Sequence, residues 1–547
     1  HAPMLAWWKG RFYLEFLAAP RDEHQDPTPT LLTSSIDGRR WSAPRVIFPA
    51  FTPEGDDHQT IAHQRMGFYV PPDGERLLVV AFYGRWPSPN EGLGIGRVVR
   101  EVGKDGRLGP IYFIRYNRHA GWDETNTPHP FFRTSPDAGF VEACEALLAD
   151  KLVVQQWWEE DRSPDGFYRL GGEGFEGKAF SWYTRADGVV VGLWKAGYAA
   201  SSSDGGRTWS ERKKLPSIVV GHAKMWGQQT EDGRFAFVYN PHFEWRYPLA
   251  LHTSEDGLTF HDMASVHGEL PDTRYQGGAK DIGPQYVRGI TPGNGDPPGD
   301  DMWLVYSMNK EDIWTSRVPV PIRSRVDEWV NDAFDGLIPG GPVDNWNVYS
   351  PLWAPVEVVA FPSVVDQSLR LADGEPYDYA RAVRVFPEAP RVDVGLRVRP
   401  EPGEAGRLEV DVLGRGGQRP VRVVLAEDGW VQAWRGDEAV KVSRYEAGTW
   451  LALRLSVRSG AGTFDLAIDG RAVLEGAAFA EPVDAVERLS LRTGAYRRIG
   501  AGLGLGRLEE DDVAPDRPGA GERVPEAVFF IDDVTVAPPR LSRIHIS

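Results

Sequence analysis

The chain has 547 residues, too many for one ordinary core, and its 60 glycines and 43 prolines, spread along the sequence, predict many turns between short strands. The formal net charge of −17 argues against a nucleic-acid partner, because no basic stripe is present to neutralise phosphates. No run of about 18 apolar residues predicts a membrane span, and the single cysteine, Cys144, cannot form an intrachain disulfide.

One hairpin pattern recurs through the first 320 residues. Each copy has a strand, a tight turn with Gly or Asp, and a strongly apolar strand. The copies are 4–18, 67–84, 140–158, 180–198, 224–240 and 286–307. Spacings of this size are typical of four-stranded propeller blades. Six copies predict a six-bladed β-propeller over 1–322. Because the chain opens on a strand pattern with His1 in place of Met, we expect an N-terminal truncation, and a seventh blade is the alternative.

A second motif marks turns inside some of these units. The segment 202–209 (SSDGGRTW) fits the pattern S-x-D-x-G-x-T-W, and 35–41 and 254–260 are looser copies. In such a turn Asp bonds local backbone N–H groups, Gly takes a positive φ, and the aromatic residue packs between strands. We therefore assign these residues a structural role.

With these motifs, the first 320 residues resemble the sialidase-like, Asp-box (BNR-repeat) propeller superfamily. That superfamily includes sialidases, other glycosidases and several polysaccharide lyases. The resemblance implies the propeller fold and a glycan as partner, and it specifies the fold better than the reaction.

The remainder of the chain is predicted to be a second all-β domain. A linker is expected over 323–355, and from 356 to 540 apolar and polar residues alternate, with Leu451, Leu453, Leu455 and Val457 on one face. This part resembles a concanavalin-like jelly roll, a β-sandwich common beside carbohydrate enzymes. A structural cap on the propeller is the alternative.

Candidate site residues follow from position in the blades. The segment before each first strand and the loop after each second strand open onto one face, which usually carries the site. On this face we predict His63, Tyr83, His222 and Arg288 as catalytic residues, and Arg65, Arg85, Trp86, Glu142, Lys224, Trp226, Gln285, Tyr306 and Lys310 as substrate-binding residues. Alternation also puts Glu142 and Cys144 on one face of a strand, toward the axial channel. Loop histidines and salt bridges between blades are the structural alternative.

Two reactions compete for these residues. A sialidase uses a Tyr nucleophile with a Glu partner, an Asp acid and three Arg on the substrate carboxylate, and the Arg-Ile-Pro signature of that family is absent. A uronate lyase needs a base, an acid and a cation. The segment 62–68, followed by 81–85, resembles propeller lyases in which a His opens the first strand and a second His follows Tyr-Gly. Arg85 stands near that second His position.

We therefore expect an enzyme that cleaves a glycosidic bond of an acidic, uronate-containing saccharide, with lyase-type elimination favoured. The alternatives are an exo-acting hydrolase of sialidase type and a non-catalytic glycan-binding protein. Arg, Lys and Trp at the candidate face suit an anionic sugar. No metal-ligand spacing or cofactor motif is present, a structural calcium ion is left open, and a secreted or periplasmic location is expected.

Overall fold

The computed structural model describes the chain except for residues 22, 24, 63–65, 88, 90–93, 158–177, 278–279, 291–292, 404–405, 495–515 and 540–547. Two compact units divide it. Among the described residues the first holds 1–324 with Asp516, and the second holds 325–494 and 517–539. No helix in the described part is long and apolar enough to cross a membrane.

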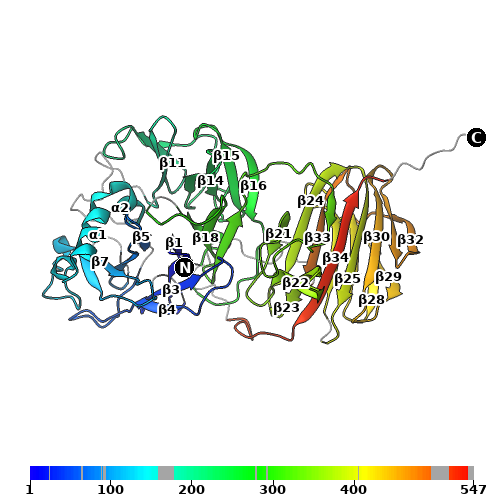
Figure 1. Cartoon of the computed structure of the whole chain (residues 1–547), viewed down its shortest axis with the longest axis horizontal. Helices are drawn as coiled ribbons and strands as arrows, with labels where there is room; N and C mark the ends of the chain where they lie inside the picture. The colour runs from blue at the N-terminus through cyan, green and yellow to red at the C-terminus, as the bar shows by residue number, and fades with distance from the viewer. Residues whose placement is uncertain are drawn as a thin grey trace, which may run out of the picture. The chain divides into compact units, whose positions relative to one another are not determined.

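The first unit is a β-propeller of five antiparallel sheets, as far as its described residues show (Figure 1). Blades 1 and 2 consist of β1 (Met4–Trp8), β2 (Arg11–Leu17), β3 (Thr30–Ser35) and β4 (Arg45–Phe48), then β5 (Gly67–Tyr69), β6 (Leu78–Gly84), β7 (Gly94–Glu101) and β8 (Tyr112–Tyr116). Blades 3 to 5 consist of β9 (Ser181–Thr184), β10 (Val190–Trp194), β11 (Tyr198–Ser202) and β12 (Lys213–Lys214), then β13 (Trp226–Gln229), β14 (Phe235–Tyr239), β15 (Leu249–Ser254) and β16 (His261–His267), then β17 (Pro284–Gly289), β18 (Met302–Met308) and β19 (Asp312–Val318). The first strands of neighbouring blades pack together: β1 contacts β5 and β17, and β13 contacts β9 and β17.

The prediction of six or seven blades is wrong, because one of the six sequence copies is helical. In this copy, 140–158, the described residues 140–157 form α1 (Ala138–Ala149) and α2 (Lys151–Trp157). Asp137 caps α1 by accepting a hydrogen bond from the backbone N–H of Phe140 at 3.0 Å. The buried residues Phe140, Cys144 and Leu147 follow the helical period, which the apolar content of the segment had concealed. Two short 3₁₀ helices, η1 (Arg118–Ala120) and η2 (Phe132–Thr134), precede α1.

Three turns between the third and fourth strands of their blades share one hydrogen-bond pattern. After β3, Asp37 Oδ1 accepts bonds from the backbone N–H groups of Arg39 and Arg40, both at 2.9 Å. Asp204 and Asp256 each hold two backbone N–H groups in the same way after β11 and β15. Their carboxylates are therefore committed to the turns.

The ring of blades closes where blade 1 meets blade 5. Gly38 has φ of +71°, and a Cβ there would lie 2.3 Å from the Trp303 ring of β18. Thr315 Oγ1 of β19 donates a hydrogen bond to the carbonyl oxygen of Gly38 at 2.9 Å. A glycine at this position therefore lets the first blade pack against the last.

The second unit is a sandwich of two antiparallel sheets, which confirms the predicted β-sandwich. One sheet, in spatial order, contains β22 (Val356–Ser363), β23 (Asp366–Asp373), β34 (Ala527–Ala537), β25 (Arg391–Pro400), β30 (Leu451–Arg458), β31 (Thr463–Ile468) and β32 (Arg471–Ala478), with β20 (Val330–Asp332) on β34. The other contains β21 (Trp346–Tyr349), β24 (Arg381–Ala389), β33 (Val486–Thr493), β26 (Leu408–Leu413), β27 (Val421–Leu425), β28 (Trp430–Arg435) and β29 (Glu438–Arg444), and η3 (Ser459–Ala461) follows β30. The segment predicted as a linker, 323–355, thus contributes β20 and β21.

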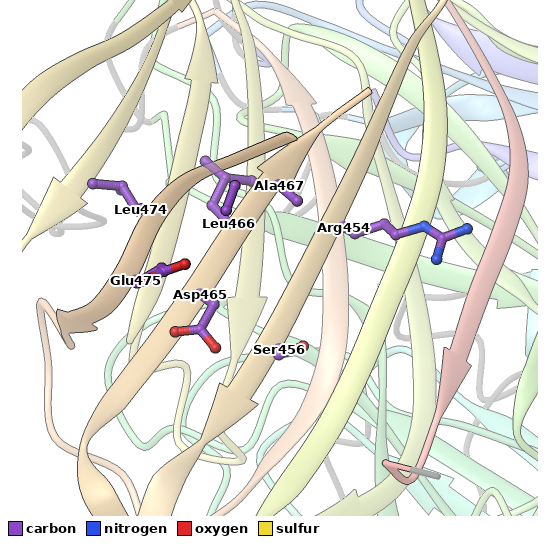
Figure 2. Close-up of a pocket in the computed structure, with 8 residues that line it drawn as sticks. Arg454, Ser456, Asp465, Leu466, Ala467, Leu474 and Glu475 are labelled. Atoms are coloured by element: carbon purple, nitrogen blue, oxygen red, sulfur yellow. The ribbon is translucent and has the colours of Figure 1, made fainter. Parts of the chain in front are cut away.

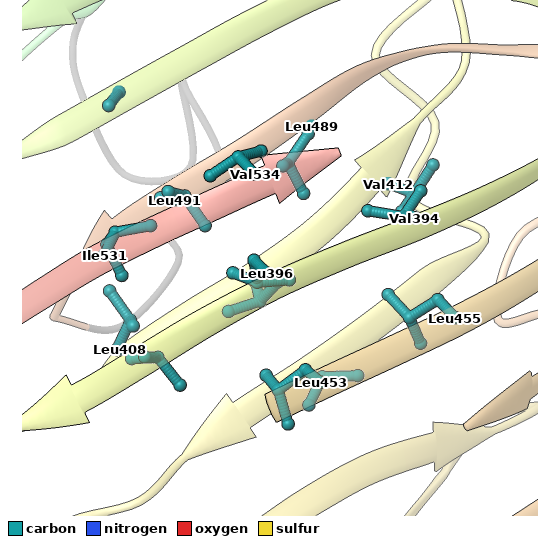
Figure 3. Close-up of a cluster of buried hydrophobic side chains, with 14 of the residues drawn as sticks. Val394, Leu396, Leu408, Val412, Leu453, Leu455, Leu489, Leu491, Ile531 and Val534 are labelled. Carbon is teal, nitrogen blue, oxygen red and sulfur yellow. The ribbon is translucent and has the colours of Figure 1, made fainter. Parts of the chain in front are cut away.

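Alternating apolar residues of both sheets meet between them and form the core of the sandwich. Leu453 and Leu455 of β30 face this core, as their alternation predicts, and each is 1% exposed. Leu396 of β25 lies beside them, and Leu489 and Leu491 come from the opposite sheet (Figure 3).

Candidate functional site

Polar and charged side chains gather at the end of the propeller where the first strands of the blades begin. The loops after the second strands reach the same end, because the two strands run antiparallel. These loops join β2 to β3, β14 to β15 and β18 to β19. The group, called the charged cluster below, consists of His1, Glu23, Lys224, Arg246, Asp281, Gln285, Tyr286 and Lys310.

Tyr286 of β17 is the centre of the charged cluster. It is 4% exposed, and its phenolic O–H donates to Glu23 Oε2 at 3.1 Å. Its backbone has φ of +59°, and the pairing of β17 with β18 changes register between Gln285 and Arg288. Such a bulge re-aims a side chain out of the regular alternation of a strand. Burial raises the pKa of Tyr286 well above its usual value, so the phenol holds its proton at neutral pH.

Three cations surround the Tyr286 ring. Lys224 Nζ lies 4.3 Å from the ring centroid, the Arg246 guanidinium carbon 5.0 Å, and Lys310 Nζ 5.7 Å. Arg246 is held by an ion pair with Asp281 at 3.0 Å. Among the described residues of the cluster, these three cations face two carboxylates, those of Glu23 and Asp281.

Glu23 joins the first blade to the last. Its Oε2 lies 2.6 Å from His1 Nε2, and its Oε1 lies 3.1 Å from Lys310 Nζ. Lys310 follows Asn309, and both have positive φ, at +56° and +53°. The amide of Asn309 anchors this bend by accepting the backbone N–H of Gly283 at 2.8 Å. The turn after β18 thus aims the Lys310 ammonium at Glu23.

A second ion group borders the charged cluster and fixes the approach to β17. Lys280 Nζ lies 2.7 Å from Glu311 Oε1, and both side chains are almost fully buried. The backbone N–H groups of Arg274 and Tyr275 donate to the same carboxylate. These contacts are satisfied within the protein, so the group supports the cluster structurally.

Two predicted residues lie at the same end of the propeller but on blade 2. Arg85 Nε donates to Asp56 Oδ2 at 2.8 Å. Trp86 is 42% exposed and stacks on His58, with ring centroids 4.2 Å apart and an interplanar angle of 15°. An exposed indole held flat in this way offers a surface on which a sugar ring can pack.

Other predicted residues are buried within the blades. The Tyr83 O–H donates to the carbonyl oxygen of Pro49 at 2.7 Å, and the residue is 1% exposed. The Tyr306 hydroxyl, also 1% exposed, lies 2.7 Å from His267 Nδ1. Both phenols point into packed interiors.

The remaining predictions divide between the propeller core and its surface. Trp226 is fully buried and donates from Nε1 to Gln228 at 2.8 Å, and the buried Arg288 guanidinium lies 5.7 Å from its ring. His222 is exposed in the segment before β13. The placement of Glu142 on a strand beside the channel is wrong: it lies on the exposed side of α1, because the segment is helical.

Of the predicted residues, three lie together in the charged cluster: Lys224, Gln285 and Lys310. His63 and Arg65 lie outside the described residues. Sequence reasoning missed Glu23 and Tyr286. Tyr286 directly follows Gln285, and strict alternation would place the two side chains on opposite faces of the strand. The sequence pattern does not predict the bulge that brings them together.

The sandwich carries a shallow groove on the outer face of β30, β31 and β32, with a volume of about 450 Å³ (Figure 2). Asp465 in this groove pairs with Arg458 through two bonds of 2.6 and 2.7 Å. The groove is lined by Arg454, Ser456, Asp465, Leu466, Ala467, Ala472, Leu474 and Glu475. No aromatic ring lines it. Across the described part of the chain, no group of three His, Cys, Asp or Glu side chains is placed to hold a metal ion.

Comparison with known proteins gives matches for both units. Residues 1–174 match the family model described as BT_1020-like, N-terminal beta propeller, and 346–501 match the one described as Sialidase-like, CBM domain. A solved structure titled "Sialidase" is 37% identical, with a TM-score of 0.91, and the match covers 99% of this chain and 50% of that one. A mutant of Trypanosoma rangeli sialidase displaying trans-sialidase activity is 11% identical, with a TM-score of 0.35 and coverage of 97% and 91%. No curated protein matches significantly.

The chain is thus an all-β protein of sialidase-like architecture. It joins a propeller of the BT_1020-like kind to a sialidase-like CBM domain, which confirms the predicted resemblance. It spans about half the length of the sialidase structure that it matches.

Proposed function

We propose that the propeller is a glycoside hydrolase for a sugar that carries a carboxylate. Tyr286 is the nucleophile and Glu23 is the base that accepts its proton. The observation that carries the proposal is the 3.1 Å hydrogen bond from the buried Tyr286 hydroxyl to Glu23, inside a ring of three cations.

A tyrosine nucleophile needs a neighbouring base, because its hydroxyl is protonated at neutral pH. Glu23 stands at the required distance and is only 8% exposed. When Tyr286 Oη attacks the anomeric carbon, its proton passes to Glu23, the bond from that carbon to the leaving sugar breaks, and the leaving oxygen takes a proton from solvent. Water then attacks the same carbon and gives its proton to solvent, and Tyr286 leaves with the proton that Glu23 held. Arg246 hydrogen-bonds the Tyr286 hydroxyl and can stabilise the negative charge that develops on the phenolic oxygen, and Lys224 lies against the same ring.

The same cations favour an acidic sugar. A carboxylate beside the anomeric carbon would repel a carboxylate nucleophile, whereas a neutral phenol approaches it without that cost. The cations around Tyr286 can pair with the substrate carboxylate, and the Arg246 fork suits its planar geometry. The departure from the three-arginine pattern of sialidases is that lysines, Lys224 and Lys310, supply two of the three charges.

Hydrolysis takes precedence over the β-elimination expected from sequence. In the stretches that resemble lyases, 62–68 and 81–85, Arg85 stands near the position of the second His and is paired with Asp56, and the Tyr83 O–H is already donated to Pro49, while His63 lies outside the described part. Elimination and simple glycan binding stay as outcomes of the test. We also propose that the sandwich is a jelly-roll accessory module that binds glycan, as the description of its family suggests.

The test uses the full chain and a panel of sialylated and uronate-containing oligosaccharides. A hydrolase releases reducing sugar without absorbance near 235 nm, whereas a lyase produces that absorbance. Tyr286→Phe should abolish turnover with the fold intact. Tyr183→Phe is the matched control, because Tyr183 is also a buried tyrosine and donates to Gly257 in a turn at the other end of the blades. Absorbance at 235 nm, or full activity of Tyr286→Phe, would reject the proposal, as would binding without any product.

A further inference from the structure

Three nearly parallel aromatic rings project from the loop between β14 and β15, at the same end of the propeller as the charged cluster. The His242 and Trp245 rings lie 4.5 Å apart with an interplanar angle of 3°, and the His242 and Phe243 rings lie 5.2 Å apart at 15°. Phe243 is 68% exposed. We call these three residues the ring platform. So large an exposed apolar side chain, backed by parallel rings, presents a flat surface to solvent.

The ring platform also has a polar group in a fixed orientation. His242 Nδ1 accepts hydrogen bonds from the backbone N–H groups of Glu244 and Trp245, at 3.1 and 2.9 Å. Because Nδ1 is an acceptor in both bonds, the proton of the neutral ring sits on Nε2. The platform therefore combines aromatic ring faces with the Nε2–H donor of His242.

The loop that carries the platform is clamped at two glycines. A Cβ at Gly221 would lie 1.6 Å from the carbonyl oxygen of Phe243, and a Cβ at Gly283 would lie 2.3 Å from that of Arg246. The Gly221 N–H donates to the carbonyl oxygen of His242 at 2.9 Å. Close backbone contact on both sides holds the rings in place before any ligand arrives.

The same loop contributes directly to the charged cluster. Arg246 immediately follows Trp245, and it pairs with Asp281 and donates to Gln285 at 2.7 Å. One short stretch of chain thus supplies both a cation beside Tyr286 and, within the few residues before it, the ring platform. A ligand held at the cluster would have its neighbouring part over the platform.

We propose that the ring platform binds the sugar that adjoins the acidic residue in the substrate, on the leaving-group side of the cleaved bond. The axial C–H groups of a pyranose pack on aromatic faces, and a ring hydroxyl can accept the His242 N–H. The cations around Tyr286 select the charged residue, whereas the platform presents aromatic ring faces, which suit a neutral sugar. This subsite rests on the proposed function for its place in the reaction, and its binding can be measured without turnover.

The experiment measures binding to full-length Tyr286→Phe protein by calorimetry. Two probe pairs are compared: 3′-sialyllactose against N-acetylneuraminic acid, and an aldotriouronic acid, in which a glucuronate is linked to neutral xylose, against glucuronic acid. For the pair that binds, Phe243→Ala should lower the affinity for the oligosaccharide about tenfold, the factor expected for loss of one aromatic stacking contact. Affinity for the monosaccharide should not change. Leu258→Ala, at another exposed apolar residue of blade 4, is the control and should change neither.

Three results would overturn the subsite: equal oligosaccharide affinity with and without Phe243, an equal loss for the monosaccharide, or no oligosaccharide that binds more tightly than its own monosaccharide. Gly221→Ala gives a second measurement, because it displaces the loop at Phe243 without removing a ring. It should weaken binding of the oligosaccharide more than binding of the monosaccharide, which shares only Arg246 with this loop. Failure of the proposed function is distinguishable. If the protein binds the oligosaccharide through Phe243 but releases no product, the proposed hydrolase function fails and the platform subsite stands. If the protein hydrolyses the substrate and Phe243→Ala changes nothing, only the platform subsite fails.

Discussion

Tyr286 and Glu23 are 263 positions apart in the sequence, yet the phenolic O–H of the one lies 3.1 Å from the carboxylate of the other. The pair is possible because blade 5 lies beside blade 1 in the closed ring, so a loop of the first blade reaches the first strand of the last. Lys310, also from blade 5, lies against Glu23 and holds the two blades together at this point. The proposed site therefore depends on ring closure.

Glu23→Gln should lower kcat about 10²- to 10⁴-fold, the range for removal of a general base. Glutamine keeps the size of the side chain and accepts the Tyr286 hydrogen bond, but it cannot take the proton. The measurement is kcat against pH, in which the limb that reports the base should disappear. Glu75→Gln is the control, since Glu75 is an exposed carboxylate paired with Lys9 and Lys104. Wild-type kcat for Glu23→Gln would contradict the role of Glu23.

Lys224→Met should remove one of the cations that select an acidic substrate. A hydrogen bond to a charged group contributes about 1.5–3 kcal/mol, so KM for an acidic oligosaccharide should rise about tenfold to a hundredfold. KM for the methyl ester of the same oligosaccharide, which lacks the charge, should change little. The comparison of KM for acid and ester in wild type and variant checks this.

The matched control for this prediction is Lys104→Met, because Lys104 is an exposed lysine on another part of the propeller. It should affect neither substrate. An equal rise in KM for acid and ester in Lys224→Met would instead point to lost packing against the Tyr286 ring, and it would remove Lys224 from substrate recognition.

The propeller class and the face of the site could be predicted because both follow from local patterns. Hairpin repeats mark the blades, and the ends of their strands mark the face, so Lys224, Gln285 and Lys310 were found. Tyr286 could not be found, because its position depends on a bulge that alternation does not encode. Glu23 lies in a long connecting loop whose path is set by the neighbouring blades rather than by its own sequence.

The blade count failed for a different physical reason. In 140–158, apolar residues are dense enough to fit both a strand and a helix, and Cys144 with Glu142 suggested alternation. The helical period of the buried residues and the N-terminal cap at Asp137 favour a helix over a strand. In the sandwich, by contrast, strict alternation through Leu451–Val457 leaves no such ambiguity, and the strand was predicted correctly.

The propeller should lose stability in mild acid through His267. Burial lowers the pKa of His267 to about 4, from an ordinary value near 6.5. Between these two pH values the unfolded chain binds a proton that the folded protein does not, so the free energy of unfolding falls as pH drops from 6.5 toward 4. The loss is about 3 kcal/mol at most. His267→Gln should flatten this slope in urea unfolding measured across the window.

His119→Gln is the control for the acid effect, because His119 is exposed. It should leave the slope unchanged. A wild-type protein whose unfolding free energy is constant from pH 6.5 to 4, or a His267→Gln variant with the full wild-type slope, would show that the buried histidine is not the source.

Gly38→Ala should destabilise the propeller at the point where the ring closes. The φ of +71° is costly for a residue with a side chain, and the new Cβ would lie 2.3 Å from the ring of Trp303, which is itself buried. Backbone strain and overpacking together should cost about 2–4 kcal/mol. Gly55→Ala separates backbone strain from overpacking, because Gly55 has nearly the same φ, +76°, but open space where its Cβ would lie. It should cost only about 1 kcal/mol.

Thermal unfolding of the Gly38→Ala and Gly55→Ala variants measures the difference in stability. Equal losses would mean that overpacking against the last blade adds nothing to the cost. Because Glu23 and Tyr286 meet only in the closed ring, Gly38→Ala should also lower kcat more than Gly55→Ala does at a temperature where both remain folded.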